Sequence, residues 1–242
     1  MKIILCIDCS IIVPYGNQEE RITQYYNGLC SIFKHKQFFI DNHIDIMLVD
    51  NTIDSLDKLP IIKECIPPYV QVLLKKNNNI GLKNKGAGVI EHWNMSHHIW
   101  KHYEYFIHFE ARQTLQYLYF FKEFIKHPMN IFSWAHKHKA AITGICINKD
   151  KQFKLHQYGI DNFHGHPEYK NDYYTGLFSI STSYLTKYIK NIDLNDMIHK
   201  SISLEKSLMC FSYYELDIFK IIDKVYVLRG GDKSDYDSIQ QN

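Results

Sequence analysis

The chain carries little net charge and no long basic run. In 242 residues, 28 Lys and Arg stand against 26 Asp and Glu, which gives a formal charge of +2. Proteins that hold a phosphate backbone gather Lys and Arg into one broad positive field, and this sequence offers none. The composition therefore argues against general nucleic-acid binding.

Long apolar runs are absent too. No stretch reaches the roughly 20 apolar residues of a membrane span. The N-terminus meets Asp8 too soon after Met1-Lys2 to resemble a secretory leader. Most of the six cysteines lie in apolar runs, where a free thiol behaves as a small hydrophobic group. We expect a reduced, cytoplasmic protein without a membrane span.

Several motifs of nucleotide and metal enzymes are also missing. No G-x-G-x-x-G opens the first helix, which disfavours a dinucleotide oxidoreductase. The 14 histidines include no H-E-x-x-H pair, and the C-x-x-C of Cys6 and Cys9 has no second pair to complete a zinc site. A sugar nucleotidyltransferase would need a Gly-rich basic loop after the first strand, where Cys9-Ser10-Ile11-Ile12 stands instead.

What the chain does have is material for one core: 45% of its residues are hydrophobic and 14% are aromatic. Apolar runs predict strands at 2–13, 44–49, 69–74 and 103–109, and helical spacing predicts helices at 18–36 and 85–102. This alternation predicts an α/β domain with a mainly parallel central sheet flanked by helices.

The second half is less regular. We expect strands at 140–147, 175–180 and 224–228, helices at 182–190 and 204–222, and a flexible tail at 229–242. No internal repeat or low-complexity linker divides the chain, so residues 1–242 are predicted to form a single domain.

Polar residues follow each predicted strand of the first half. Ligands of parallel sheets gather beyond the carboxyl ends of the strands. That rule makes a candidate site of four groups: Pro14-Tyr15, Asp50-Asn51, the segment 79–85, and the segment from His108 to Arg112.

The order of these motifs resembles glycosyltransferases of the GT-A fold, a Rossmann-like fold, and most closely their large inverting family, family 2. The matching segments are Ile12-Val13-Pro14-Tyr15, Val49-Asp50-Asn51-Thr52, Asn79-Ile80-Gly81, His108-Phe109-Glu110, Thr175-Gly176-Leu177-Phe178 and Ser203-Leu204-Glu205. The similarity extends over about residues 2 to 220, and its strength lies in the order and spacing of the motifs.

The resemblance implies transfer of a sugar from a nucleoside-diphosphate sugar, with UDP-sugars favoured, to a hydroxyl of a glycan or other acceptor. Residues 1–115 would bind the donor and 116–228 the acceptor. The implied donor residues are Pro14, Tyr15, Asp50, Asn79, Gly81, Lys85, His108, Glu110 and Arg112, and the implied acceptor residues are Tyr173, Tyr174, Thr175 and Gly176.

One motif departs from the family. The D-x-D position is His108-Phe109-Glu110, so a single carboxylate remains where two usually hold a cation. His108 and Glu110 could still ligate Mn²⁺ or Mg²⁺, because alternate residues of a strand point the same way. Equally, Arg112 or a nearby lysine could neutralise the diphosphate without a metal.

An inverting transferase also needs a carboxylate that takes the acceptor proton. The resemblance gives this role to Glu205, with Asp172 and Asp161 as substitutes. A plain structural role is open for each choice, since Asp50 could cap a turn and Glu205 could be a first-turn glutamate favoured by the helix dipole. A non-catalytic module that binds a nucleotide or glycan, or a sugar nucleotidyltransferase, remains the alternative.

Overall fold

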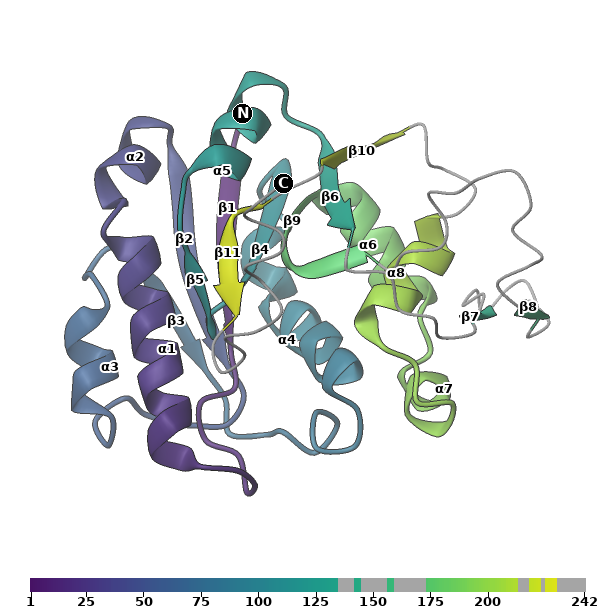
Figure 1. Cartoon of the computed structure of the whole chain (residues 1–242), viewed down its shortest axis with the longest axis horizontal. Helices are drawn as coiled ribbons and strands as arrows, with labels where there is room; N and C mark the ends of the chain where they lie inside the picture. Colours follow the sequence, from purple (N-terminus) through teal and green to yellow (C-terminus); the bar gives the residue numbers. More distant parts are fainter. Residues whose placement is uncertain (135–141, 145–155, 159–172, 213–217, 223–224, 230–242) are drawn as a thin grey trace.

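The computed structural model describes residues 1–134, 142–144, 156–158, 173–212, 218–222 and 225–229. At its centre is a seven-stranded sheet in the order β10-β6-β9-β4-β1-β2-β3, with β10 and β3 at opposite edges (Figure 1). The strands are β1 (Ile3–Cys9), β2 (Ile44–Asp50), β3 (Gln71–Leu74), β4 (Tyr105–Glu110), β6 (Asn130–Trp134), β9 (Tyr173–Ser181) and β10 (Phe219–Ile222).

Most neighbours in this sheet are parallel. β1 pairs in parallel with β2 and β4, β2 with β3, and β10 with β6, whereas β9 runs antiparallel to both β4 and β6. Two small sheets, both antiparallel, join β5 (Gln113–Leu115) to β11 (Val227–Arg229) and β7 (Ile142–Gly144) to β8 (His156–Tyr158). The predicted α/β class with a mainly parallel sheet is confirmed.

Helices cover both faces of the sheet because alternate strand residues point to opposite sides. Ile3, Leu5 and Ile7 of β1 face one apolar cluster, and Ile4 and Cys6 face the other. The first cluster includes residues of α1 (Gln18–Phe33), α2 (Lys36–Asp41), α3 (Pro60–Cys65) and α5 (Tyr119–Lys126). The second includes residues of α4 (Lys85–Trp100), α6 (Thr182–Asn191), α7 (Leu194–His199) and α8 (Leu204–Ser212).

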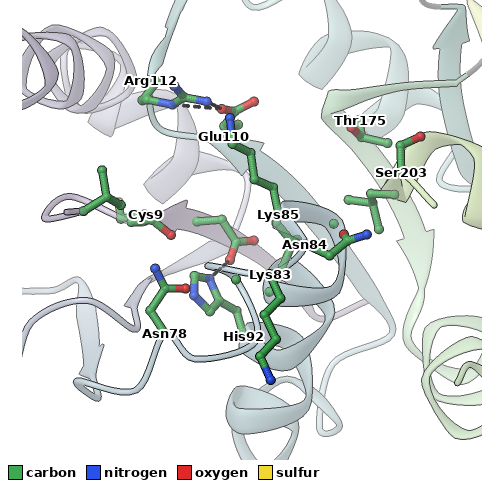
Figure 2. A pocket seen from close by; sticks show the side chains of 18 of the residues that line it. Cys9, Asn78, Lys83, Asn84, Lys85, His92, Glu110, Arg112, Thr175 and Ser203 are labelled. Carbon is green, nitrogen blue, oxygen red and sulfur yellow. Dashed lines mark hydrogen bonds and ion pairs between the residues drawn. The ribbon is translucent and has the colours of Figure 1, made fainter. Parts of the chain in front are cut away.

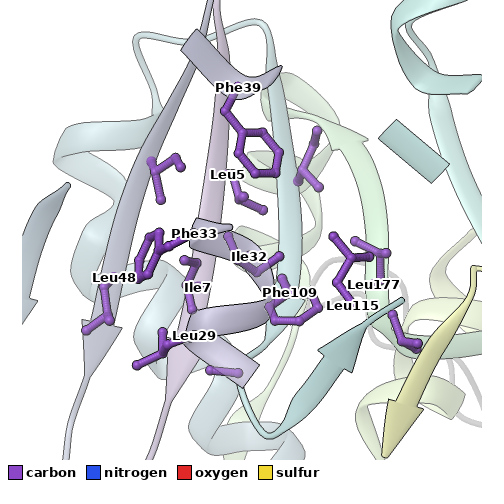
Figure 3. Packing of buried hydrophobic residues seen from close by; sticks show 14 of the residues in the cluster. Leu5, Ile7, Leu29, Ile32, Phe33, Phe39, Leu48, Phe109, Leu115 and Leu177 are labelled. Atoms are coloured by element: carbon purple, nitrogen blue, oxygen red, sulfur yellow. The ribbon is translucent and has the colours of Figure 1, made fainter. Parts of the chain in front are cut away.

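Helix α1 shows how the sequence builds the first cluster. The Asn17 side chain caps its N-terminus by accepting hydrogen bonds from the backbone N–H groups of Glu19 and Glu20. Leu29, Ile32 and Phe33 recur at helical spacing and lie buried against Leu5, Ile7 and Phe109 of the sheet (Figure 3).

The C-terminal part of the structure differs from one prediction. The helix predicted at 204–222 is found over Leu204–Ser212 as α8 and is wrong over 219–222, because Phe219 to Ile222 form β10 and pair with β6. A short segment such as Phe219-Lys220-Ile221-Ile222 can form a strand as well as the end of a helix, and only the pairing partner decides between them. That partner, β6, was itself not predicted. Residues 230–242, most of the predicted tail, lie outside the described residues.

Smaller differences concern element ends. The first strand is shorter than predicted, since β1 ends at Cys9, and the helix predicted at 18–36 ends at Phe33, with α2 beginning at Lys36. Within the described ranges, none of the helices combines the length and apolar character needed to cross a bilayer.

Candidate functional site

A cavity of about 440 Å³ opens at the carboxyl ends of β1 and β4, beside the N-terminal ends of α4 and α8 (Figure 2). Its position agrees with the strand-end rule, and its size is that of a small-molecule site. Eight of the predicted site residues line it: Tyr15, Gly81, Lys85, His108, Glu110, Arg112, Thr175 and Glu205.

The loop after β1 is fixed by helix α1. The Ser10 N–H donates to the Tyr25 hydroxyl at 2.8 Å, and the Arg21 guanidinium donates to the Ser10 carbonyl through Nε at 2.9 Å and Nη2 at 2.5 Å. Ser10, Arg21 and Tyr25 all line the cavity, and the sequence alone singled out none of them. Pro14, predicted to form the wall beside Tyr15, lies outside the lining.

Asp50 is a buried residue that holds two loops together. It is fully buried, and its carboxylate accepts hydrogen bonds from the backbone N–H groups of Ile11 at 2.8 Å, Thr52 at 2.6 Å and Ile53 at 3.2 Å. The side chain therefore joins the loops that follow β1 and β2. The donor-binding role that the resemblance implies for Asp50 does not fit this position, because its carboxylate is fully buried and has no exposed surface for a ligand.

The turn between β3 and α4 packs closely against the helix. A Cβ placed on Gly88 would lie 2.6 Å from the Cα of Gly81, so position 88 needs glycine for the two backbones to approach, whereas a Cβ on Gly81 would meet the Asn78 side chain. Asn78 lines the cavity and accepts a hydrogen bond from Asn51 at 3.2 Å, whereas the predicted Asn79 is exposed and outside the lining.

Asn84 joins the N-terminus of α4 to α7 and to the segment just before α8. Its side-chain oxygen caps α4 by accepting from the Ala87 N–H at 3.0 Å, and its Nδ2 donates to the carbonyls of Met197 at 3.0 Å and Ile202 at 2.9 Å. Two residues after Asn84, a Cβ on Gly86 would lie 2.6 Å from the Leu204 nitrogen. This close approach brings Lys85 and Glu205 to the same cavity.

Glu205 lies in the first turn of α8, and its Oε1 accepts a hydrogen bond from the Thr175 hydroxyl at 2.7 Å. The bond connects the carboxylate to Thr175 of β9, and both residues line the cavity. A carboxylate held this way at a cavity wall can accept a proton from a bound hydroxyl group.

The other predicted acceptor residues belong to the core. Tyr173 is fully buried, stacks on Phe132 with ring centroids 4.5 Å apart, and lies with its hydroxyl 3.0 Å from that of Ser212. The Tyr174 hydroxyl donates to Gln113, whose side chain also packs against Gly176. Only Thr175 of this set lines the cavity. Asp172 and Asp161, the other candidate bases, lie outside the described residues.

Asp8 is a buried cavity residue that the sequence analysis did not place in the site. Its Oδ1 is 2.8 Å from His92 Nδ1, and its Oδ2 lies 3.0 Å from Trp93 Nε1 and 2.7 Å from His108 Nδ1. Burial alone would raise the pKa of Asp8, but the charges and hydrogen bonds of His108 and His92 outweigh burial and hold it well below its usual range.

A sequence signal for Asp8 existed. It is the single charged residue in a strand that is otherwise apolar, and a buried acid needs partners. Those partners come from α4 and β4, about 84 to 100 positions along the chain, so the sequence could flag Asp8 without naming them.

At the end of β4, Glu110 holds Arg112. The guanidinium donates to Glu110 Oε1 through Nε at 3.1 Å and Nη2 at 2.7 Å, and Gln113 Nε2 donates to Oε2 at 3.1 Å. Burial would raise the pKa of Glu110, yet the Arg112 charge lowers it overall, and the Glu110 charge raises the pKa of Arg112 against its own burial. Both groups are therefore ionised at neutral pH.

Four cationic side chains surround the cavity: Arg21, Lys83, Lys85 and Arg112. Against them stand Glu110, already paired with Arg112, the histidine-bound Asp8, and Glu205. This arrangement can bind an anion beside Arg112 and Lys85 and present a proton acceptor, Glu205, in the same cavity.

No family model matches the sequence, and no curated protein is similar to it at the sequence level. Solved structures are similar in fold. The mannosyltransferase Ktr4p of S. cerevisiae has a TM-score of 0.52 at 9% identity, over 91% of this chain and 68% of that one. TarS residues 1–349 of S. aureus has a TM-score of 0.50 at 13% identity, over 95% of this chain and 60% of that one.

These likenesses show the fold. The chain has the predicted GT-A-type α/β fold, with a mainly parallel sheet flanked by helices. It spans 68% of the length of the Ktr4p chain and 60% of the length of the TarS 1–349 chain.

Proposed function

We propose that the protein is a glycosyltransferase that moves a sugar from a nucleoside-diphosphate sugar, with UDP-sugars favoured, to a hydroxyl group of a glycan or other acceptor. The observation that carries the proposal is the meeting of cationic side chains and an oriented carboxylate, Glu205, in one strand-end cavity. The fold shared with known glycosyltransferases supports it.

The proposed reaction is a direct displacement with inversion. As the acceptor oxygen forms a bond to the anomeric carbon, the bond from that carbon to the phosphate oxygen breaks, and its electron pair leaves with the diphosphate. Arg112 and Lys85 stabilise the charge that develops on the leaving group, and Glu205 takes the acceptor proton. Thr175 positions Glu205 for this step.

Donor binding is the first test. A ligand that binds only the native state raises the melting temperature by mass action. We expect a shift with one class of nucleoside diphosphate and its sugar nucleotide in a panel screened with and without Mn²⁺ or Mg²⁺. The absence of a shift with every member would remove the basis of the proposal.

Turnover is the second test, and it separates an enzyme from a module that only binds. Hydrolysis of the identified sugar nucleotide, with water as acceptor, should be slow in the native protein. Glu205→Gln should lower its rate by about 10² to 10⁴ while leaving donor affinity unchanged. Glu64→Gln, at an exposed glutamate of α3 outside the cavity, is the matched control. Binding without any hydrolysis would favour the non-catalytic module.

A further inference from the structure

We propose that the Arg112 guanidinium, held by Glu110 and Gln113, takes the place of the divalent cation at the donor diphosphate, so that the donor binds without a metal. The inference rests on the proposed function. It starts from the two predicted metal ligands, His108 and Glu110. Neither side chain is placed to hold a metal ion.

Both carboxylate oxygens of Glu110 already accept hydrogen bonds. Its Oε1 accepts from two nitrogens of Arg112, at 2.7 and 3.1 Å, and its Oε2 accepts from Gln113 at 3.1 Å. A metal ion bound here would have to displace a charge-assisted pair and would meet the guanidinium charge two residues along the chain. The carboxylate is thus arranged to bind a cation that the protein itself supplies.

His108 is equally unsuited as the second ligand. Its side chain is only 3% exposed, and its Nδ1 lies against the Asp8 carboxylate at 2.7 Å. The ring stacks on Phe178 at 5.0 Å between centroids and meets the Trp93 ring edge-on at 5.5 Å. Aromatic rings therefore enclose the imidazole.

A third ligand is also lacking. Asp8, which neighbours Glu110 across the β1–β4 pair, gives its oxygens to His92, Trp93 and His108. Within the portion of the chain that the structure describes, no group of three or more His, Cys, Asp or Glu side chains is placed to hold a metal ion. The carboxylates of Asp8 and Glu110 at this edge of the sheet are therefore already paired with nitrogen groups of the protein.

Arg112 has the properties that the substitute cation needs. Its pKa is raised by the Glu110 charge, so the guanidinium stays ionised, and its side chain is 26% exposed at the cavity. A guanidinium has five N–H donors, and Glu110 engages only those on Nε and Nη2. The remaining donors suit phosphate oxygens, and Lys85 extends from α4 toward the same place (Figure 2).

The test compares donor binding with and without metal. Isothermal titration of the native protein with UDP, or with the nucleoside diphosphate that the thermal screen identifies, should give the same dissociation constant in EDTA and in Mn²⁺. The electron paramagnetic resonance signal of free Mn²⁺ should keep its amplitude when protein is added, which reports metal binding independently of activity.

Variants assign the effect to Arg112. Arg112→Gln should weaken UDP binding in EDTA by at least about ten-fold. Arg112→Lys should weaken it by less, because lysine keeps the charge but lacks the planar pair of N–H donors. Lys63→Gln, at an exposed lysine paired with Asp57 far from the cavity, should leave the affinity unchanged. Far-UV circular dichroism establishes whether each variant is folded. If Arg112→Gln does not fold, Arg112→Lys is used to test the role of Arg112.

The outcomes separate the two proposals. UDP binding that requires Mn²⁺, together with a loss of the free Mn²⁺ signal that Glu110→Gln abolishes, overturns the inference and leaves the glycosyltransferase proposal standing. Equal binding by Arg112→Gln and the native protein also overturns it. Absence of nucleotide binding in both buffers overturns the proposed function and this inference with it.

Discussion

Replacing Asp8 with asparagine is expected to destabilise the protein strongly, although the two side chains have nearly the same shape. The native carboxylate faces three nitrogen groups of His92, Trp93 and His108 at 2.7 to 3.0 Å. An asparagine offers one oxygen and turns an NH₂ group toward the remaining donors. At least one buried donor then loses its acceptor, and the negative charge is lost as well.

The size of the effect follows from these two losses. An unsatisfied buried donor costs about 1 to 3 kcal/mol, and breaking a buried charged pair costs about 3 to 5 kcal/mol. Because the asparagine retains one hydrogen bond, we expect a loss of about 3 kcal/mol. For a domain of this length that corresponds to a fall in Tm of roughly 6 to 12 °C.

Urea unfolding followed by tryptophan fluorescence measures the loss, since Trp93 is buried beside Asp8. Asp45→Asn is the matched control, because Asp45 is exposed and accepts one hydrogen bond, from the Tyr103 hydroxyl at 2.8 Å. If the two substitutions cost the same within about 0.5 kcal/mol, the buried Asp8 cluster does not stabilise the fold as argued.

The stability of the native protein should also depend on pH through the ionisation of Asp8. The pKa of Asp8 in the folded chain lies below its ordinary value of 3.8, so its stabilising contribution is fully present above that value. As the pH falls below 3.8, protonation removes the contribution progressively. The native protein should lose stability over this acid range more steeply than Asp8→Asn, and parallel pH curves for the two proteins would contradict the assignment.

Three further substitutions probe the cavity walls. Asn84→Asp keeps the oxygen that caps α4 but loses both Nδ2 hydrogen bonds, so urea unfolding should show a loss of about 1 to 2 kcal/mol with helix content retained. Gly86→Ala places a methyl group 2.6 Å from a backbone nitrogen of α8 and should cost about 1 to 3 kcal/mol, whereas Asn94→Ala on the exposed face of α4 should not destabilise. Thr175→Val releases Glu205 and should lower sugar-nucleotide hydrolysis about ten-fold at unchanged donor affinity; a weaker donor affinity would instead place Thr175 in the donor site.

The sequence by itself determined the class of fold and the edge of the sheet where the site lies. Apolar runs and helical spacing are local patterns, and they located β1, β2, β4 and α4 with errors only at the ends. The strand-end rule then brought Tyr15, Lys85, Glu110 and Arg112 to one place, because parallel strands open their carboxyl ends at one edge.

The tertiary structure alone decided which of the polar side chains are free for a ligand. Asp50 and Glu110 are both acids at strand ends, yet Asp50 is consumed by backbone N–H groups while Glu110 holds Arg112 at the cavity. Asp8 becomes part of the site through partners more than 80 residues away, and β10 is a strand because β6 lies beside it. The physical reason is that satisfaction of a buried polar group depends on donors and acceptors brought from distant positions by folding, which local periodicity does not encode.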